Sequence, residues 1–158
     1  MGIVFDKALT FDPHINEIIS KANKMLGFIR RSFRFLDKVT FVTLYKAFVR
    51  SHLEYGDVLW CLYLKRQSVT LEKVQRKATK LIPSLRNLPY GKRLRELDLP
   101  TLKYRRLRGD LIYMYKIFNN LVDTESNMLT VVPYNRTRNC TQKLYVQYSR
   151  TNTRRSFL

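Results

Sequence analysis

Histidine and cysteine, which often bind metals or act as nucleophiles, are few in this chain and far apart. The two histidines, His14 and His52, lie 38 positions apart, and the two cysteines, Cys61 and Cys140, lie 79 positions apart. A metal site needs such ligands clustered, and two cysteines cannot build a disulfide framework. His52 falls on the apolar face of a predicted helix and is expected to be a hydrogen-bonded core residue. The sequence therefore predicts no metal site and no cofactor, and its cysteine content favours a reducing compartment.

The carboxylates form no catalytic pattern either. Glu96 and Asp98 are paired at the end of a short predicted helix, where capping and charge balance explain them better than acid–base catalysis. A two-metal polymerase centre needs converging aspartates, as in a Tyr-x-Asp-Asp hairpin, and that sequence is absent. Five glycines leave little material for a phosphate-binding loop. We therefore expect these residues alone to be non-catalytic.

Basic residues dominate the charge of the chain. Lysine and arginine number 30 against 12 acidic residues, giving a net charge of +18, which indicates a polyanionic partner. Residues 61–123 carry a net +10, against +3 for residues 1–60 and +5 for residues 124–158. The alternative is a helical bundle whose solvated faces happen to be basic, although such faces normally mix both signs.

The candidate nucleic-acid-binding residues are cations of this middle segment. They are Lys73, Arg76, Lys77, Lys80, Lys92, Arg93, Arg95, Arg105 and Arg106. Helical spacing places the first four opposite an apolar face formed by Leu71, Val74 and Ala78. Contacts of such cations with phosphates give affinity without sequence preference, so the expected partners are RNA, DNA or an RNA–DNA hybrid.

Aromatic residues alternate with arginines in two places, and exposed rings can stack on unpaired bases. One place is the run from Phe28 to Phe35, which contains Arg30, Arg31 and Arg34. The other surrounds Tyr104. Because most of these aromatics fall at core-facing helical positions, we expect most of them to pack in the core. The tyrosines near the C-terminus are better stacking candidates: Tyr134, Tyr145 and Tyr148.

The hydrophobic pattern predicts a mainly α fold. A hydrophobic content of 45% is that of a globular chain. Apolar residues at helical spacing predict helices over residues 13–33, 37 to 51–55, 68–82, 90–97 and 100–120, and Met1–Asp6 is expected to form a short strand. We expect a bundle of four to six helices. The expected organisation is an N-terminal remnant (1–11), a helical domain (12–122) and a basic, weakly structured tail (123–158) with a strand-like patch at 143–148.

The helix starts carry recognisable capping signals. Asp12 is expected to be the N-cap of the first helix, with Pro13 at its first position, and Asp37 opens the second. Ser68 is expected to cap the third helix, with Glu72 near its first turn. No stretch approaches the roughly 18 apolar residues of a membrane span, and Met1–Thr10 does not resemble a secretory signal. We therefore expect an intracellular protein, nuclear or cytoplasmic.

Short motifs follow one another along nearly the whole chain. They are Gly2-Ile-Val-Phe-Asp6, Leu9-Thr-Phe11, His14-Ile15, Leu44-Tyr-Lys46, Val49-Arg50, His52-Leu-Glu-Tyr-Gly56, Trp60, Glu72-Lys-Val-Gln-Arg76, Arg93-Leu-x-Glu-Leu-x-Leu-Pro-Thr-Leu102, Tyr104-Arg-Arg-Leu-Arg-Gly-Asp-Leu111 and Tyr115-Lys-Ile-Phe-Asn119. In this order and spacing they resemble the segment after the catalytic palm in reverse transcriptases of jockey-like non-LTR retrotransposons (LINEs).

The resemblance implies the thumb and adjoining connection of an RNA-directed DNA polymerase, a helical region that packs against the primer–template duplex. The catalytic aspartates and their magnesium would belong to the palm upstream of Met1, and the palm and fingers would be protein partners. This chain would then be a truncated element copy, inactive alone. Ser51 stands where the family usually has proline, so a bend there is expected to be softer. Arg138–Leu158 is similar to the family's following basic stretch.

Two other interpretations remain open. The open reading frame could be a degenerate remnant without a selected function, or one that serves as a protein-interaction module, with its basicity inherited. A genuine polymerase would require this chain to be one piece of a longer product.

Overall fold

The computed structural model describes residues 2–57, 59–60, 65–122, 148 and 150. The chain divides into two compact units, Met1–Leu107 and Arg108–Leu158. In the second unit, the described residues are 108–122, 148 and 150. The predicted strand-like patch therefore lies outside the described residues except for Tyr148. The described part is mainly helical, which confirms the predicted fold class.

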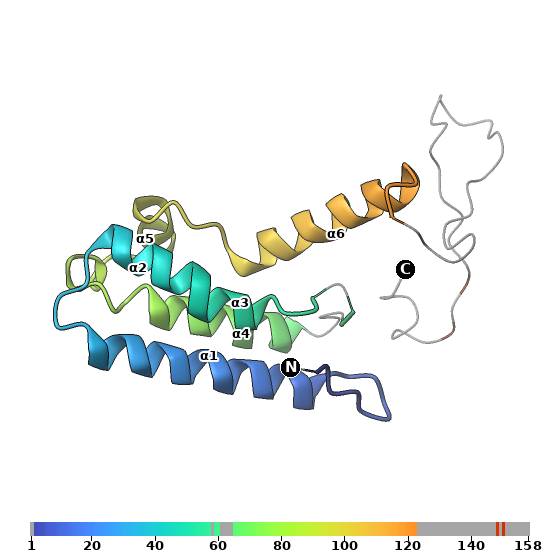
Figure 1. Ribbon diagram of the computed structural model, residues 1–158, viewed down its shortest axis with the longest axis horizontal. Coiled ribbons are helices and arrows are strands. Elements are labelled where there is room, and N and C mark those ends of the chain that lie inside the picture. The colour runs from blue at the N-terminus through green and yellow to red at the C-terminus, as the bar shows by residue number, and fades with distance from the viewer. Residues whose placement is uncertain (1, 58, 61–64, 123–147, 149, 151–158) are drawn as a thin grey trace. The chain divides into compact units, whose positions relative to one another are not determined.

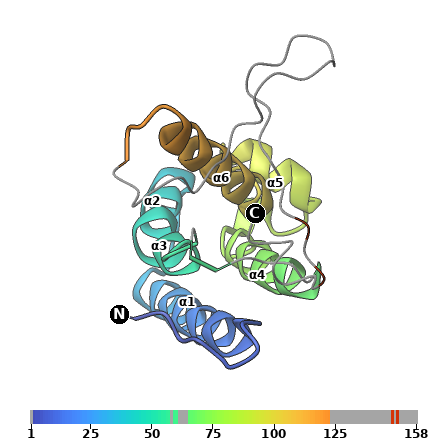
Figure 2. The ribbon, with the colours of Figure 1, turned by 90° about the vertical axis from the view of Figure 1, so that its right-hand side faces the viewer.

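The longest predicted apolar stripe forms α1 (Asp12–Ser32). Ile15, Ile18, Ala22, Leu26 and Ile29 recur every three or four residues along α1 and are all buried. They face two other layers, because α1 lies beside both α3 and α4 (Figures 1 and 2). The spacing of apolar residues in the sequence thus identifies the innermost face of the first unit.

The second predicted helix consists of three consecutive segments: α2 (Lys38–Leu44), a π-helix, η1 (Tyr45–Arg50), and α3 (Ser51–Leu53). Phe41, Tyr45, Val49 and Leu53 are its buried residues and lie four positions apart. The π-helix bonds i to i+5, so its turn is wider and keeps residues four apart on one side. The sequence spacing of Phe41, Tyr45 and Phe48 predicts one inward face, but Phe48 is 52% exposed and Val49 is buried in its place.

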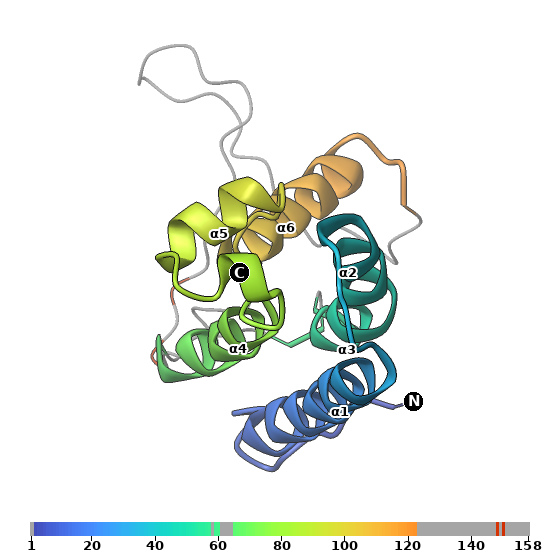
Figure 3. The ribbon, with the colours of Figure 1, turned by 90° about the vertical axis from the view of Figure 1, so that its left-hand side faces the viewer.

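The remaining helices are α4 (Lys65–Ala78), a 3-10 turn, η2 (Pro83–Leu85), α5 (Tyr90–Glu96) and α6 (Leu102–Phe118). Figure 3 shows α1, α4 and the α2–α3 run side by side. Leu102 is buried, but Tyr104, Leu107, Leu111 and Tyr115 are more than half exposed. The helical spacing of these four residues predicts a packing face, but that face is largely solvent-exposed, because amphipathic spacing does not by itself supply a partner.

The N-terminal residues do not form the predicted strand. Residues 2–6 have no regular structure and belong to the first unit. The Asp6 carboxylate accepts hydrogen bonds from the backbone N–H of Thr10 (3.0 Å) and of Phe11 (2.6 Å), which closes a turn. The Val4 N–H donates to Nδ1 of His14 at 3.4 Å. Because these bonds hold the segment against α1, a partner strand is not needed.

Two predicted caps are wrong and one is confirmed. Phe11, not Asp12, holds the N-cap position of α1, because Asp12 already lies in its first turn. α4 begins at Lys65, so Ser68 lies inside the helix instead of capping it. The Asp37 carboxylate accepts from the N–H groups of Val39 and Thr40, both at 3.1 Å, as an N-cap does.

Among the histidines, the buried one is His14, not His52. His14 is 1% exposed and its ring packs edge-on against Trp60, with centroids 5.5 Å apart, whereas His52 is only half-buried. Burial lowers the pKa of His14. The expectation of a core histidine at position 52 is therefore corrected.

Candidate nucleic-acid interface

The candidate interface is built on α4, whose inner face anchors it to the first unit. The apolar residues predicted for that face, Leu71, Val74 and Ala78, are buried. Two glutamines, Gln67 and Gln75, are buried with them. The sequence prediction missed both glutamines, although their spacing from Leu71 places them on the same stripe.

The two glutamines fix the position of α4 through hydrogen bonds. Gln75 accepts a 2.8 Å bond from the Tyr45 hydroxyl and donates a 2.8 Å bond to the carbonyl oxygen of Pro100. Gln67 donates to the carbonyl oxygen of Thr10 and to the Asp12 carboxylate, both at 2.8 Å. Leaving a buried amide without partners costs about 1–3 kcal/mol, so these bonds specify how α4 is rotated.

The outer face of α4 presents cations. Lys73, Arg76 and Lys77 are exposed, and so is Lys80 in the turn that follows the helix. None of the four forms an ion pair within the described part of the chain. The arrangement agrees with the predicted helical face. It leaves a row of positive charge facing solvent.

The single carboxylate of α4, Glu72, is engaged in hydrogen bonds within the fold. Glu72 accepts a hydrogen bond from the Tyr90 hydroxyl and another, at 3.1 Å, from the backbone N–H of Leu102. Burial raises the pKa of Tyr90, and its hydrogen bond to Glu72 raises it further. Glu72 therefore acts as an acceptor that joins α4 to the start of α5 and of α6.

Arg93 lies inside the fold, unlike the other predicted site residues of α5. It is 4% exposed, and its Nη1 donates to the carbonyl oxygen of Arg76 and to the Thr79 hydroxyl, both at 2.9 Å. Its guanidinium lies 5.5 Å from the centre of the Tyr90 ring, and burial lowers its pKa. Arg93 packs α5 against the end of α4. It is therefore not part of the exposed surface.

The neighbouring cations of α5 remain at the surface. Lys92 and Arg95 are exposed and make no ion pair with the described residues. Glu96 instead pairs with Lys38 at 2.6 Å, and that hydrogen bond lowers the pKa of Glu96. Arg76 leans towards this helix, with its guanidinium 4.8 Å from the centre of the Tyr90 ring.

The two predicted cations of α6 are engaged in the fold. Arg105 donates to the Glu54 carboxylate through Nε and, at 2.9 Å, through Nη2, and this hydrogen bonding raises the pKa of Arg105. Arg106 lies over Trp60, with its guanidinium 3.9 Å from the ring centre. Both side chains are half-buried. The structure thus does not bring Arg105 and Arg106 onto the α4 face.

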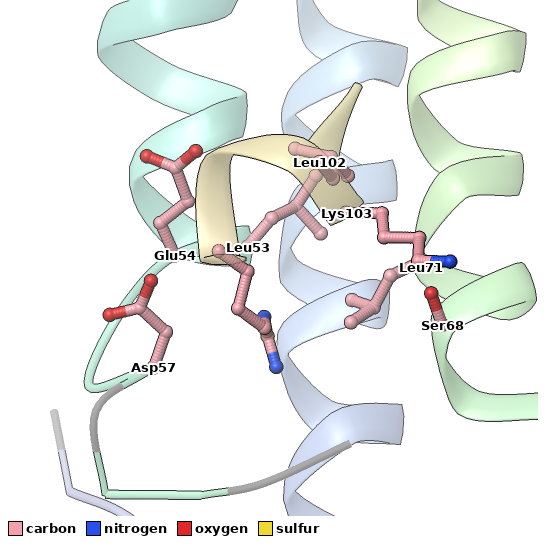
Figure 4. Close-up of a pocket in the computed structure, with 8 residues that line it drawn as sticks. Leu53, Glu54, Asp57, Ser68, Leu71, Leu102 and Lys103 are labelled. Atoms are coloured by element: carbon pink, nitrogen blue, oxygen red, sulfur yellow. The ribbon is translucent and has the colours of Figure 1, made fainter. Parts of the chain in front are cut away.

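A small hollow lies between the end of α3, the start of α4 and the start of α6 (Figure 4). Glu54 and Asp57 line one side, and Ser68 and Lys103 line the other. Its volume of about 10 Å³ suits a single water molecule, not a nucleotide. Among the residues the structure describes, no three histidine, cysteine or acidic side chains gather as a metal-binding group. The prediction that the chain holds no cofactor stays a prediction.

No protein-family model, curated protein or solved structure matches the chain significantly. None of the helices in the described ranges is both long and apolar enough to cross a bilayer. Tyr134 and Tyr145 lie outside the described residues, and Tyr148 is 88% exposed.

Proposed function

We propose that the chain is a thumb-like region of a non-LTR retrotransposon reverse transcriptase and that it binds the backbone of RNA, DNA or their hybrid. The observation that carries the binding proposal is the row of Lys73, Arg76, Lys77 and Lys80. These cations face solvent and have no ion-pair partner in the described part. The family assignment is supported by the sequence motifs alone.

The dimensions of the row suit a phosphate backbone. From Lys73 to Lys80 the chain advances about 10 Å at 1.5 Å per residue. Over that length a duplex carries about six phosphate charges, since it has one per 1.7 Å of axis. Several lysines and arginines can therefore contact phosphates at once. Such contacts release counterions and do not read bases.

Salt dependence tests this proposal. The triple variant Arg76→Gln, Lys77→Gln, Lys80→Gln should flatten the slope of log affinity against log salt by roughly two to three, at about 0.9 per phosphate contact. The matched control, Lys7→Gln, Lys46→Gln, Lys116→Gln, removes the same charge from other exposed positions. We expect a much smaller change in the control. Equal changes in both variants would mean that net charge, not the α4 face, determines binding.

A protein-interaction remnant is the second candidate function. The apolar residues Tyr104, Leu107 and Leu111 are more than half exposed on α6, and exposed apolar side chains in a row are typical of protein contacts. This candidate predicts that the α4 triple variant and its matched control change nucleic-acid affinity equally, because only the net charge then attracts the polyanion. The binding experiment above therefore separates the two functions.

A further inference from the structure

The last turns of α1 and the connection to α2 expose aromatic rings. Phe35 is 85% exposed, Phe28 58% and Phe33 38%, although Leu36 in the same connection packs against the core. A phenyl ring stabilises a fold when it is buried, so packing within the described residues does not explain these three rings. We call Phe28, Phe33, Phe35 and the intervening Arg30, Arg31 and Arg34 the aromatic–arginine corner.

Hydrogen bonds fix both ends of this connection. The Phe33 N–H donates to the carbonyl oxygen of Ile29 at 3.2 Å, which closes α1. The Asp37 carboxylate caps α2 through the N–H groups of Val39 and Thr40. Phe33 and Phe35 therefore lie in a short, anchored connection, and Phe28 lies in α1 itself. Binding there costs less conformational entropy of the protein than binding to a long loop that must become ordered.

The aromatic–arginine corner carries positive charge that can contact a ligand. Arg30, Arg31 and Arg34 are exposed and make no ion pair within the part of the chain that the structure describes. The Arg34 guanidinium lies 5.9 Å from the centre of the Phe35 ring. The nearest following cation, Lys38, is already paired with Glu96. The corner therefore suits a ligand that is anionic and also offers flat apolar faces.

The corner lies at the same end of the bundle as the cations at the end of α4. α1 and α4 run in the same direction, because Asp12 pairs with Arg66 and Asn23 with Lys77, at a constant offset along both helices. α4 ends one residue after Lys77, whereas α1 continues nine residues past Asn23, about 13 Å further (Figure 1). The corner therefore lies beyond the C-terminal end of α4.

We propose that the aromatic–arginine corner binds unpaired nucleotides that extend from a duplex held on the α4 face. The bases would stack on Phe33 and Phe35, and the arginines would contact the phosphates between them. Each unpaired nucleotide offers one flat face and one negative charge, which matches the composition of the corner. This inference rests on the proposed function and adds to it a preferred substrate, a duplex with a single-stranded overhang.

Two DNA probes test the inference on the full chain. One is a blunt duplex of about 20 base pairs, and the other carries in addition an overhang of about eight adenines, one of them replaced by fluorescent 2-aminopurine. We expect the overhang to tighten binding about tenfold or more and to quench the 2-aminopurine. Phe35→Ala, and Phe33→Ala with Phe35→Ala, should reduce this advantage to about twofold or less. Their affinity for the blunt duplex should not change.

Phe48→Ala is the matched control, because it removes a half-exposed ring from η1. It should keep the overhang advantage, and circular dichroism should show unchanged helix in all variants. Blunt-duplex binding without an overhang advantage would overturn this inference and leave the proposed function intact. No blunt-duplex binding at all would overturn the proposed function. Binding of phosphatidylserine vesicles through Phe35, without 2-aminopurine quenching, would also overturn the inference.

Discussion

Arg93 donates a 2.9 Å hydrogen bond from Nη1 to the backbone carbonyl oxygen of Arg76, so a buried cation holds the backbone of an exposed one. The same nitrogen also donates to the Thr79 hydroxyl at 2.9 Å. The bonds tie α5 to the last turn of α4, where Arg76 faces solvent. The two arginines therefore differ in role although both come from the basic middle segment. Arg93 positions the surface on which Arg76 is displayed.

Replacing Arg93 should destabilise the fold without changing the salt dependence of binding. Arg93→Met removes the donors to Arg76 and Thr79, and the unsatisfied acceptors should cost about 1–3 kcal/mol in the free energy of unfolding, measured with urea. Arg95→Gln, on the exposed side of α5, should change it by less than about 0.5 kcal/mol. A flattened salt slope in folded Arg93→Met protein would show instead that Arg93 contacts phosphate.

The buried Tyr45 hydroxyl gives a prediction at alkaline pH. Burial raises the pKa of Tyr45. The unfolded chain, with an ordinary tyrosine pKa near 10, releases this proton first, so the stabilisation is complete below pH 10 and is lost as pH rises further. Stability should therefore fall above about pH 10. In an ultraviolet titration of the folded protein, Tyr45 should ionise after the exposed tyrosines.

Tyr45→Phe isolates the hydrogen bond itself. It leaves Gln75 Oε1 without its 2.8 Å partner in the core and should cost about 1–3 kcal/mol at neutral pH. Tyr104→Phe changes a side chain that is 58% exposed and should be nearly neutral. A neutral Tyr45→Phe variant would mean that the glutamine finds another donor.

Because His14 is buried in its neutral form, we expect the folded state to lose stability below neutral pH. Nδ1 of His14 accepts the Val4 N–H, which requires the unprotonated nitrogen, and burial lowers the pKa of His14. The stabilisation is therefore complete above the ordinary histidine pKa of about 6.5 and is lost as pH falls below it. We expect the urea concentration at the midpoint of unfolding to decrease as the pH is lowered from 7.5 to 5. The fluorescence of Trp60, whose ring contacts His14, should change over the same interval.

His52→Gln is the control for this titration, because His52 is half-buried on another element. It should keep the pH dependence, whereas His14→Gln should remove most of it. The reverse result would assign the titration to His52.

Purified full chain should not extend a primer. Phosphoryl transfer by two metals needs converging carboxylates. The acids that line the small hollow are Glu54 and Asp57, and Glu54 is already hydrogen-bonded to Arg105. With primed RNA, deoxynucleotides and magnesium or manganese, we expect no product above a mock preparation. Extension that disappears in a Glu54→Gln or Asp57→Asn variant would contradict this.

The helices could be predicted from the sequence because their stripes are regular. α1 keeps one residue in three or four apolar over its whole length, and no alternative element fits that period. The π-helix could not be predicted in this way, because the choice of a wider turn depends on what Tyr45 and Val49 pack against. The strand-like composition of the N-terminal segment predicts a strand, which the structure does not contain there. The segment's conformation is set by bonds to Asp6 and His14, which are side-chain contacts.

The candidate site was predictable where spacing alone decides exposure. Lys73, Arg76 and Lys77 lie opposite the apolar stripe of α4, and they are exposed. Arg93 precedes Leu97 by four residues, so its spacing already places it on the buried side of α5. The same spacing relates Arg106 to Leu102. Charge alone favours the surface for both residues, but helical spacing places each on the side of its helix that packs against the fold.

A methyl group added at Gly56 tests both the backbone conformation there and the contact with Ile3. The Gly56 φ of +64° is unfavourable for other residues, and an added Cβ would lie 2.7 Å from Cδ1 of Ile3. Gly56→Ala should therefore destabilise the first unit by about 1–2 kcal/mol, of which about 1 kcal/mol comes from the backbone conformation.

A double-mutant cycle separates the two contributions. In an Ile3→Ala background the steric part of the Gly56→Ala cost should disappear and the backbone part should remain. The control, Gly91→Ala in α5, meets nothing within 4 Å and should stabilise the chain by about 0.5–1 kcal/mol. If the cost of Gly56→Ala is the same with and without Ile3, the N-terminal segment does not rest on Gly56. That result would contradict the docking of residues 2–6 on the first unit.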